Sequence, residues 1–224
     1  MRIVTEIQEL LARLGAHSGS FPEDLLAEII LRREEAIPVL LTKLEDIDRN
    51  PEPWLADGDG MVHVYALYLL ALFLEVRAYP LLVRIFSRPG EFPFDLAGDV
   101  VTQDMGRILA SVSGGDVSGM TALIENERAN EYVRSVAMEG MVLLVETGQR
   151  ARDEVISYLL EGSTCNCAPS CGPTLTHLFS CSLQHQDFLL RRSAQHLQNL
   201  HSAFDRPVAL VRQSPQGQSF DGLC

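Results

Sequence analysis

Long apolar runs are missing from this chain, and their absence excludes a membrane-spanning helix. The most apolar stretch covers residues 61–74 and is 14 residues long, whereas a helix needs about 20 residues to cross a bilayer. The N-terminus reaches an acidic residue, Glu6, before any apolar run of signal-peptide length. We therefore expect a soluble, cytoplasmic protein whose five cysteines are reduced rather than paired in disulfides.

Basic residues are also scarce. The chain has 18 Lys and Arg residues against 30 Asp and Glu residues, which gives a net charge of −12 at pH 7. Binding to nucleic acid or to an anionic membrane surface needs a clustered basic face. The charge therefore argues against both of these partners and favours a basic protein or peptide.

Motifs of the common enzyme classes are absent. The sequence contains no GxSxG, Walker A, HExxH or dinucleotide-binding fingerprint. The segment Asp57–Gly60 is similar to the start of a calcium loop, but the further acidic position and the closing glutamate are missing. We expect these carboxylates to favour the N-terminus of the following helix instead, and we predict no cofactor.

Helical periodicity is what the sequence does contain. Apolar residues recur at helical spacing, and no stretch alternates with the period of two that is typical of a strand. The segment Ala36–Leu41 returns 42 residues later as Ala78–Leu82, and in both segments we expect the proline to open a helix. Similarity at a period of about 35–45 residues is typical of a solenoid.

These patterns predict an all-α fold. We expect an N-terminal helix within residues 1–19, a HEAT-like α-solenoid of about four antiparallel hairpins over 20–162, and an irregular tail over 163–224. The expected helix pairs are 25–30 with 36–47, 61–74 with 78–85, 101–112 with 120–124, and 133–144 with 155–159.

Turn and cap signals mark the ends of these helices. Ser20 and Glu23 have the spacing of a capping box. Gly114 with Gly115, and Gly148 further on, are expected to end helices. The two longest loops, residues 49–59 and 87–99, should lie along one edge of the stack.

Four residues are candidates for a binding site: His63, Tyr65, Asp104 and Arg107. His63, Tyr65 and Tyr68 lie on the most apolar helix, where a histidine is either a core or edge residue or a polar group on a concave groove. Asp104 and Arg107 are three residues apart and share the polar side of their helix. We expect this pair to be solvated, so that losing it would cost under about 1 kcal/mol.

Several segments together resemble a bacterial family of unknown function, DUF1186, which is HEAT-like in character. The segments are Val62–Ala71, Arg77–Leu82, Arg107–Val112 and Asn130–Ser135. The resemblance covers about residues 20–162, and its motifs are structural, so it implies a fold and not a chemistry. Some members of the family continue into a small cysteine-rich zinc module, the SEC-C motif.

The cysteines of the tail are similar to that module only in part. Cys165 and Cys167 open as the module does, and His177 falls where its last ligand would be, but the cysteine that should precede it is missing. Cys171 or Cys181 could complete the set, because zinc asks only for four tetrahedral donors. The resulting spacing matches no zinc pattern that we can justify. We therefore expect free thiols, with a zinc site at Cys165, Cys167, Cys171 and His177 as the alternative.

The tail also differs from the rest of the chain in composition. All 17 glutamates precede residue 163, and all five cysteines follow it. Apolar residues around 190–200 have the spacing of one helix, which could close the stack as a cap. Two explanations remain: a divergent capping appendage, or a change of reading frame that replaced later hairpins.

Two functional interpretations follow. The first is a non-enzymatic scaffold for protein–protein interaction with an acidic surface. The second is a metal-dependent accessory protein or an enzyme, with its site in the groove around His63 or in the segment Cys165–Cys181. The sequence offers no nucleophile–base pair and no intact set of metal ligands, so it favours the first.

Overall fold

The computed structural model describes residues 2–16, 21–56 and 60–162. This part of the chain is all-α, and its only β feature is an isolated bridge between Pro89 and Ala129. None of its helices is long and apolar enough to span a bilayer. The helices are α1 (Arg2–Gly15), α2 (Glu23–Leu31), α3 (Arg33–Arg49), α4 (Glu52–Ala56), α5 (Val62–Leu72), α6 (Ala78–Phe86), α7 (Phe92–Ala97), α8 (Val100–Gln103), α9 (Met105–Ser113), α10 (Ser118–Glu125), α11 (Glu131–Glu146) and α12 (Arg152–Gly162).

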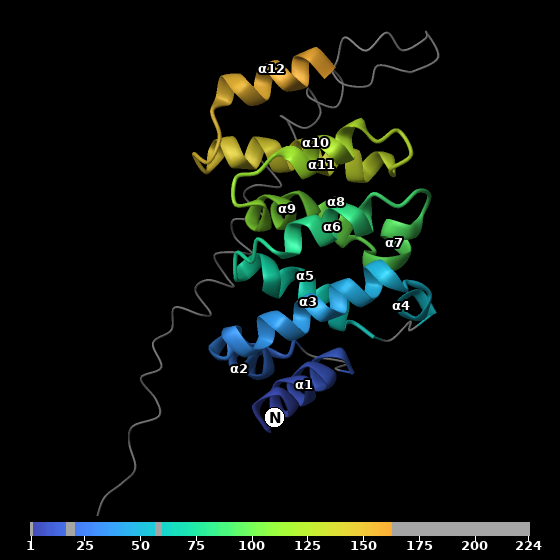
Figure 1. Ribbon diagram of the computed structural model, residues 1–224, viewed down its shortest axis with the longest axis vertical. Helices are drawn as coiled ribbons and strands as arrows, with labels where there is room; N and C mark the ends of the chain where they lie inside the picture. Colours follow the sequence, from blue (N-terminus) through green and yellow to red (C-terminus); the bar gives the residue numbers. More distant parts are fainter. Residues whose placement is uncertain (1, 17–20, 57–59, 163–224) are drawn as a thin grey trace, which may run out of the picture. The chain divides into compact units, whose positions relative to one another are not determined.

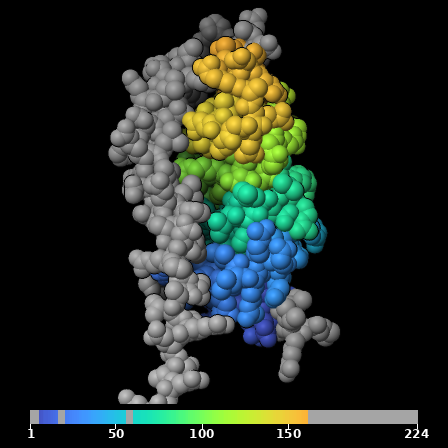
Figure 2. All heavy atoms as spheres, turned by 90° about the vertical axis from the view of Figure 1, so that its left-hand side faces the viewer, coloured from blue at the N-terminus to red at the C-terminus, as the bar shows by residue number. Residues whose placement is uncertain are grey.

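The longer helices pack in two series, each made of helices that are not adjacent in the sequence. α1, α5, α9 and α11 contact in succession, and α3, α6 and α10 form a second succession beside them. The contacts α3–α5, α6–α9 and α10–α11 join the two successions, and α12 packs on α11. Figure 1 shows this order from α1 in blue to α12 in orange, and the space-filling view in Figure 2 shows the same order of colours.

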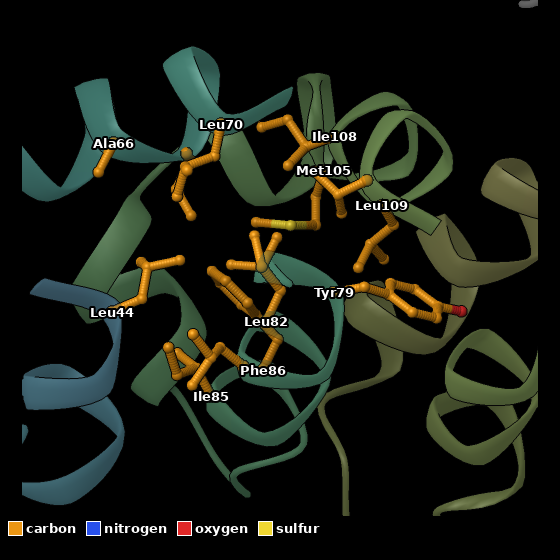
Figure 3. Close-up of a cluster of buried hydrophobic side chains, with 14 of the residues drawn as sticks. Leu44, Ala66, Leu70, Tyr79, Leu82, Ile85, Phe86, Met105, Ile108 and Leu109 are labelled. Atoms are coloured by element: carbon orange, nitrogen blue, oxygen red, sulfur yellow. The ribbon is translucent and has the colours of Figure 1, made fainter. Parts of the chain in front are cut away.

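The core is one cluster of buried apolar side chains that runs from α1 to α12. Its central part lies between α3, α5, α6 and α9, where Leu70, Leu82 and Leu109 meet with no exposed surface (Figure 3). Full burial of such a side chain stabilises the fold by about 1.5–3 kcal/mol. Ile7 and Leu11 of α1 are equally buried, so the N-terminal helix belongs to this core and is not a separate element.

Nine side-chain hydrogen bonds between the described helices and their turns have a similar spacing along the sequence, whereas the bonds from Arg32 to Glu6 and from Arg134 to Ile124 span 26 and 10 residues. The bond from Tyr68 to Asp104 spans 36 residues, and the bond from Asn130 to Gly90 spans 40. The same range, 33 to 41 residues, holds for the bonds made by His63, Arg84, Arg88, Asn126, Arg150 and Tyr158, and for the bond from Met120 to Tyr79.

α9 and α11 cross so closely that only glycine fits at the contact. A Cβ added to Gly106 would lie 2.9 Å from the backbone oxygen of Val136, and a Cβ added to Gly140 would lie 3.0 Å from the backbone oxygen of Gly106. Glycine inside a helix costs about 0.5–1 kcal/mol relative to alanine. Here that cost is offset because the two helices bring their apolar faces into direct contact.

Asp104 divides one expected helix into two. A single helix was predicted over residues 101–112, but α8 ends at Gln103 and α9 begins at Met105. Asp104, with φ −132° and ψ −13°, is both the C-cap of α8 and the N-cap of α9. Its side chain does not cap α9, because it is bonded to Tyr68 and Arg107 instead.

The predicted start of α2 is wrong. This helix begins at Glu23, its N-cap is Pro22, and no side-chain hydrogen bond caps it. Glu23 is therefore the first residue of the helix and not the third, so it cannot complete a capping box. Ser20 lies outside the described residues.

The role predicted for the two prolines is right for one of them. Pro80 lies in the first turn of α6, where its missing N–H costs nothing. Pro38 lies inside α3, because this helix begins at Arg33, directly after α2. The position is tolerated although one backbone hydrogen bond is lost there.

The turns and loops follow the sequence more closely. Gly114 ends α9 with φ 59°, and Gly148 follows α11 with φ 70°. The loops over residues 49–59 and 87–99 each contain a short helix, α4 and α7. These two helices contact each other, so the described parts of the two loops lie side by side.

Replacing Gly106 with alanine tests the close crossing. We expect Gly106→Ala to lower the free energy of unfolding by about 1–3 kcal/mol, because α9 and α11 must move apart. Alanine alone would favour the helix by about 1 kcal/mol, so the sign of the change is informative. Urea denaturation measures it, with Ser111→Ala on the same helix as the control; a more stable Gly106→Ala variant would contradict the crossing.

Candidate functional site

His63 is a structural residue at the edge of the core. Its side chain is 7% exposed, and its Nε2 lies 2.6 Å from the backbone oxygen of Leu96 in α7. Its ring meets the ring of Trp54 edge-on at 5.9 Å, and Trp54 donates a hydrogen bond to Asp46. His63 thus joins α5 to α4 and α7.

Tyr65 does not share a site with His63. Successive residues of a helix are about 100° apart, so these two side chains are about 200° apart around α5. Tyr65 is partly buried against the core. It lies one turn before Tyr68, on the side of α5 that meets α9.

Tyr68, Asp104 and Arg107 form a hydrogen-bonded group between α5 and α9. The Tyr68 hydroxyl donates to Oδ2 of Asp104 at 2.6 Å, and an Arg107 guanidinium nitrogen donates to Oδ1 at 3.0 Å. Arg107 also donates to the backbone oxygen of Gln103 at 3.1 Å. Both oxygens of Asp104 are therefore occupied.

This pair is less exposed than the sequence led us to expect. The side chains of Arg107 and Asp104 are 19% and 28% exposed, so the pair is partly buried and not fully solvated. Tyr68, which comes from another helix, covers the carboxylate. Burial, followed by the hydrogen bond to Asp104, raises the pKa of Tyr68, so that its hydroxyl remains a donor at neutral pH.

Glu139 completes the group from α11, and the sequence analysis did not single it out. A Cβ added to Gly106 would lie 3.2 Å from its carboxyl carbon, so Glu139 extends over the glycine that precedes Arg107. Burial raises its pKa, while the charge of Arg107 lowers it and the charges of Asp104 and Glu146 raise it. Among the described residues it accepts no hydrogen bond and forms no ion pair.

We call Tyr68, Asp104, Arg107 and Glu139 the polar cluster. Tyr68, Asp104 and Glu139 follow one another at intervals of 36 and 35 residues. Tyr68 lies in α5, Asp104 is the N-cap of α9, and Glu139 lies in α11. Chemically, the cluster offers one carboxylate that is free to accept hydrogen bonds. Such a group suits a cationic donor, because charge-assisted hydrogen bonds are the stronger ones.

Metal chemistry finds no support in the described residues, where no group of three or more His, Cys, Asp or Glu side chains could hold an ion. The alternative zinc ligands Cys165, Cys167, Cys171 and His177 lie outside the described residues, and so does Cys181. The same holds for residues 57–59 of the calcium-like segment. α5 begins at Val62, with Met61 as its N-cap.

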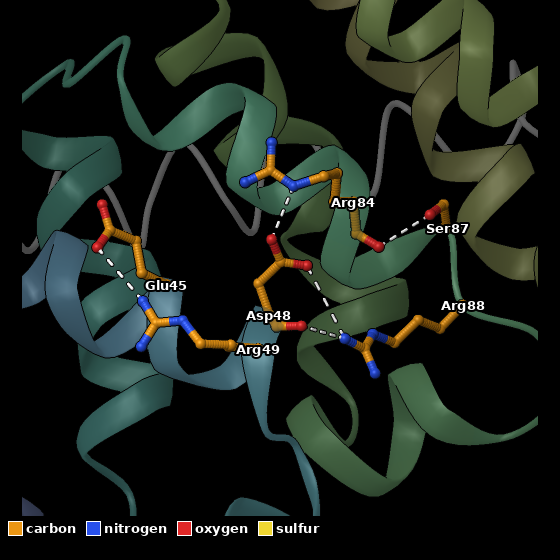
Figure 4. Close-up of polar contacts among 6 residues, drawn as sticks. All are labelled: Glu45, Asp48, Arg49, Arg84, Ser87 and Arg88. Carbon is orange, nitrogen blue, oxygen red and sulfur yellow. Dashed lines mark hydrogen bonds and ion pairs between the residues drawn. The ribbon is translucent and has the colours of Figure 1, made fainter.

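A second group of polar side chains lies at the C-terminal end of α3 and holds this helix against α6. Asp48 accepts a hydrogen bond from Nε of Arg84 at 2.7 Å, and Arg88 donates to its backbone oxygen (Figure 4). These contacts join α3 to α6. Arg49 beside them pairs only loosely with Glu45, at 4.0 Å and with 73% of its side chain exposed.

Arg107 and Arg49 make a matched pair for testing burial. We expect Arg107→Ala to lower the free energy of unfolding by about 1–3 kcal/mol, because it removes charge-assisted hydrogen bonds and leaves Asp104 half-buried. Arg49→Ala should cost under about 0.5 kcal/mol, as exposed i,i+4 pairs do. Chemical denaturation measures both, and equal small losses would mean that the polar cluster is solvated after all.

Glu139 should make stability depend on pH in a defined direction. Because its pKa is raised in the folded state, the folded protein binds this proton more tightly than the unfolded chain does. The ionised carboxylate therefore destabilises the fold at neutral pH, and this penalty disappears as the pH falls through the raised pKa towards 4.5. Glu139→Gln should be more stable than the wild type at neutral pH, and this advantage should vanish in acid.

The control for this measurement is Glu127→Gln, which removes the same charge from an exposed loop position. Its effect on the melting temperature should be small and should change little with pH. If Glu139→Gln is instead less stable at neutral pH, Glu139 has a stabilising partner in the folded protein.

Comparison with known proteins finds one family whose sequence model matches most of this chain. Residues 5–163, which include the whole cluster, match the family described as "Protein of unknown function (DUF1186)". A protein of Chlamydia muridarum, described as uncharacterized, is 38% identical over 156 residues, 70% of this chain and 62% of that protein. An uncharacterized protein of Chlamydia trachomatis is 36% identical over 156 residues, which are again 70% of this chain and 62% of that protein.

The chain thus spans less than two thirds of the length of these relatives. No solved structure matches it. The family match ends at residue 163, where the sequence loses its glutamates and gains its cysteines. On the match over residues 5–163, this chain belongs to the DUF1186 family.

Proposed function

We propose that this protein is a HEAT-like α-solenoid that acts as a non-enzymatic scaffold and binds a basic protein or peptide. The binding surface is the side of α5, α9 and α11 that carries the polar cluster. Glu139 is the group that meets the partner's cationic side chain. The observation that carries the proposal is this half-buried carboxylate, which accepts no hydrogen bond from the described residues.

The repeat architecture is supported by two features of the packing. The first is the pair of helix successions, α1–α5–α9–α11 and α3–α6–α10, which corresponds to hairpins stacked one upon another. The second is the spacing of 33 to 41 residues in the hydrogen bonds between helices. In repeat proteins each unit contacts its neighbours, and equivalent positions line one extended surface.

The choice of a basic partner rests on charge. The chain carries a net charge of −12, which attracts cations at long range. At short range, a guanidinium group can offer two parallel N–H donors to the free carboxylate of Glu139. The guanidinium of Arg107 does not already satisfy Glu139, because its bonds are directed to Asp104 and Gln103.

The remaining expectations stay predictions. A cytoplasmic location, and a partner that is neither nucleic acid nor membrane, follow from charge and composition alone. An enzymatic or metal-dependent role around His63 has no geometric support, since its ring is committed to Leu96 and Trp54.

Peptide binding tests the proposal. A fluorescent arginine-rich peptide should bind the full chain, and its affinity should fall at least about tenfold between about 0.05 M and about 0.5 M salt, because screening weakens exposed charge contacts. Glu139→Gln should weaken binding by a similar factor although it stabilises the fold. Glu127→Gln should bind as the wild type does. Absence of binding at low salt, or affinity indifferent to salt, would contradict the proposal.

A further inference from the structure

Four exposed aliphatic side chains gather at the edge of the molecule where the tight helix–helix turns lie. Leu31 belongs to the turn between α2 and α3 and is 80% exposed. Leu72, Leu74 and Val76 belong to the turn between α5 and α6 and are 49%, 65% and 54% exposed. We call these four residues the aliphatic ridge.

The two turns that carry the ridge are neighbours. The Arg33 guanidinium, just after Leu31, lies 5.7 Å from the ring centroid of Phe73, between Leu72 and Leu74. On the other side, a Cβ added to Gly114 would lie 3.0 Å from Val76, so the ridge reaches the next turn as well. Exposed aliphatic side chains on neighbouring turns mark an interaction site more often than isolated apolar residues do.

Leu74 has a backbone conformation that disfavours leucine. Its φ is 54°, and it is the one non-glycine residue with positive φ in the described part of the chain. It ends α5 in the position where helices normally place glycine, with the amide of Glu75 bonded to the carbonyl of Leu70 at 3.0 Å. A left-handed backbone is unfavourable for leucine, and the exposed side chain gains nothing by burial within the monomer. Strain of this kind points to a functional use of the side chain.

The charges around the ridge indicate what kind of surface would cover it. The basic residues at the two turns are Arg32, Arg33 and Arg77, and each of them pairs with at least one glutamate. Together with these glutamates (Glu6, Glu28, Glu34 and Glu75) they carry a formal charge of −1, in a chain whose net charge is −12. Arg33 lies 3.2 Å from Glu34, and Arg77 lies 2.7 Å from Glu75, so each of these two basic groups has an acidic group beside it.

We propose that the aliphatic ridge is the contact surface between two copies of this chain. A copy related by a twofold axis presents the same ridge and the same charges, so an acidic group can face each basic group. Elsewhere, two chains of charge −12 repel each other, whereas here the near-neutral turns let them approach. A strongly basic partner would meet Arg33 and Arg77, so the ridge is distinct from the surface proposed for the basic peptide.

Sedimentation velocity of the full chain tests this proposal. Between about 1 µM and about 200 µM, a range that covers weak association, the average mass should rise from that of the 24.8 kDa monomer towards twice that value. Leu74→Glu should raise the dissociation constant at least about tenfold. Leu55→Glu is the control, because Leu55 is 37% exposed on α4 at the opposite edge, and it should dimerise as the wild type does.

Leu74→Gly is a second variant, chosen because it should remove the side chain without destabilising the fold. Glycine suits the positive φ, so the melting temperature should not fall, while loss of the side chain should weaken the dimer. Glu139→Gln should leave dimerisation unchanged, which keeps this result separate from peptide binding. A wild type that is monomeric throughout, or a Leu74→Glu variant that dimerises as tightly as the wild type, overturns the proposal.

Discussion

The close crossing of α9 and α11 at Gly106 and Gly140 is the constraint on which the polar cluster depends. With backbone oxygens about 3 Å from where either Cβ would be, any larger residue forces the helices apart. The crossing holds Glu139 over Gly106, beside the guanidinium of Arg107. The packing of these two helices therefore fixes where the Glu139 carboxylate lies relative to the ion pair of Asp104 and Arg107.

The polar cluster also needs the third helix of the same succession. Tyr68 reaches Asp104 only because α5 packs on α9, and its hydroxyl shields the carboxylate from water. The break at Asp104 between α8 and α9 lets this side chain turn aside from the helix it precedes. Stability and site geometry are thus linked, since the contacts that stack the helices also set the environment of Glu139.

The sequence predicted the elements better than it predicted their surroundings. Apolar periodicity located the helices, and glycines located their ends, because both are local properties. α5 is apolar on nearly every side, so periodicity could not show that Tyr68 faces α9 while His63 faces α7. The burial of Asp104 was equally hidden, because its cover lies 36 residues away. One signal was present: Tyr68, Asp104 and Glu139 recur at the repeat spacing, so aligning the repeats would have brought them together.

Glu139 and Leu74 have one physical feature in common. Each lowers the stability of the isolated chain: the carboxylate because it is half-buried without a donor, the leucine because its backbone is left-handed. Neither is needed for packing, since glutamine and glycine would fit these positions at lower free energy. Both lie at the outer side of tightly packed elements, where a neighbouring molecule can supply the missing contact. Residues that lower the stability of the monomer in this way are expected where a protein binds. The peptide site and the dimer contact that we propose would each supply the contact that one of these two residues lacks in the monomer.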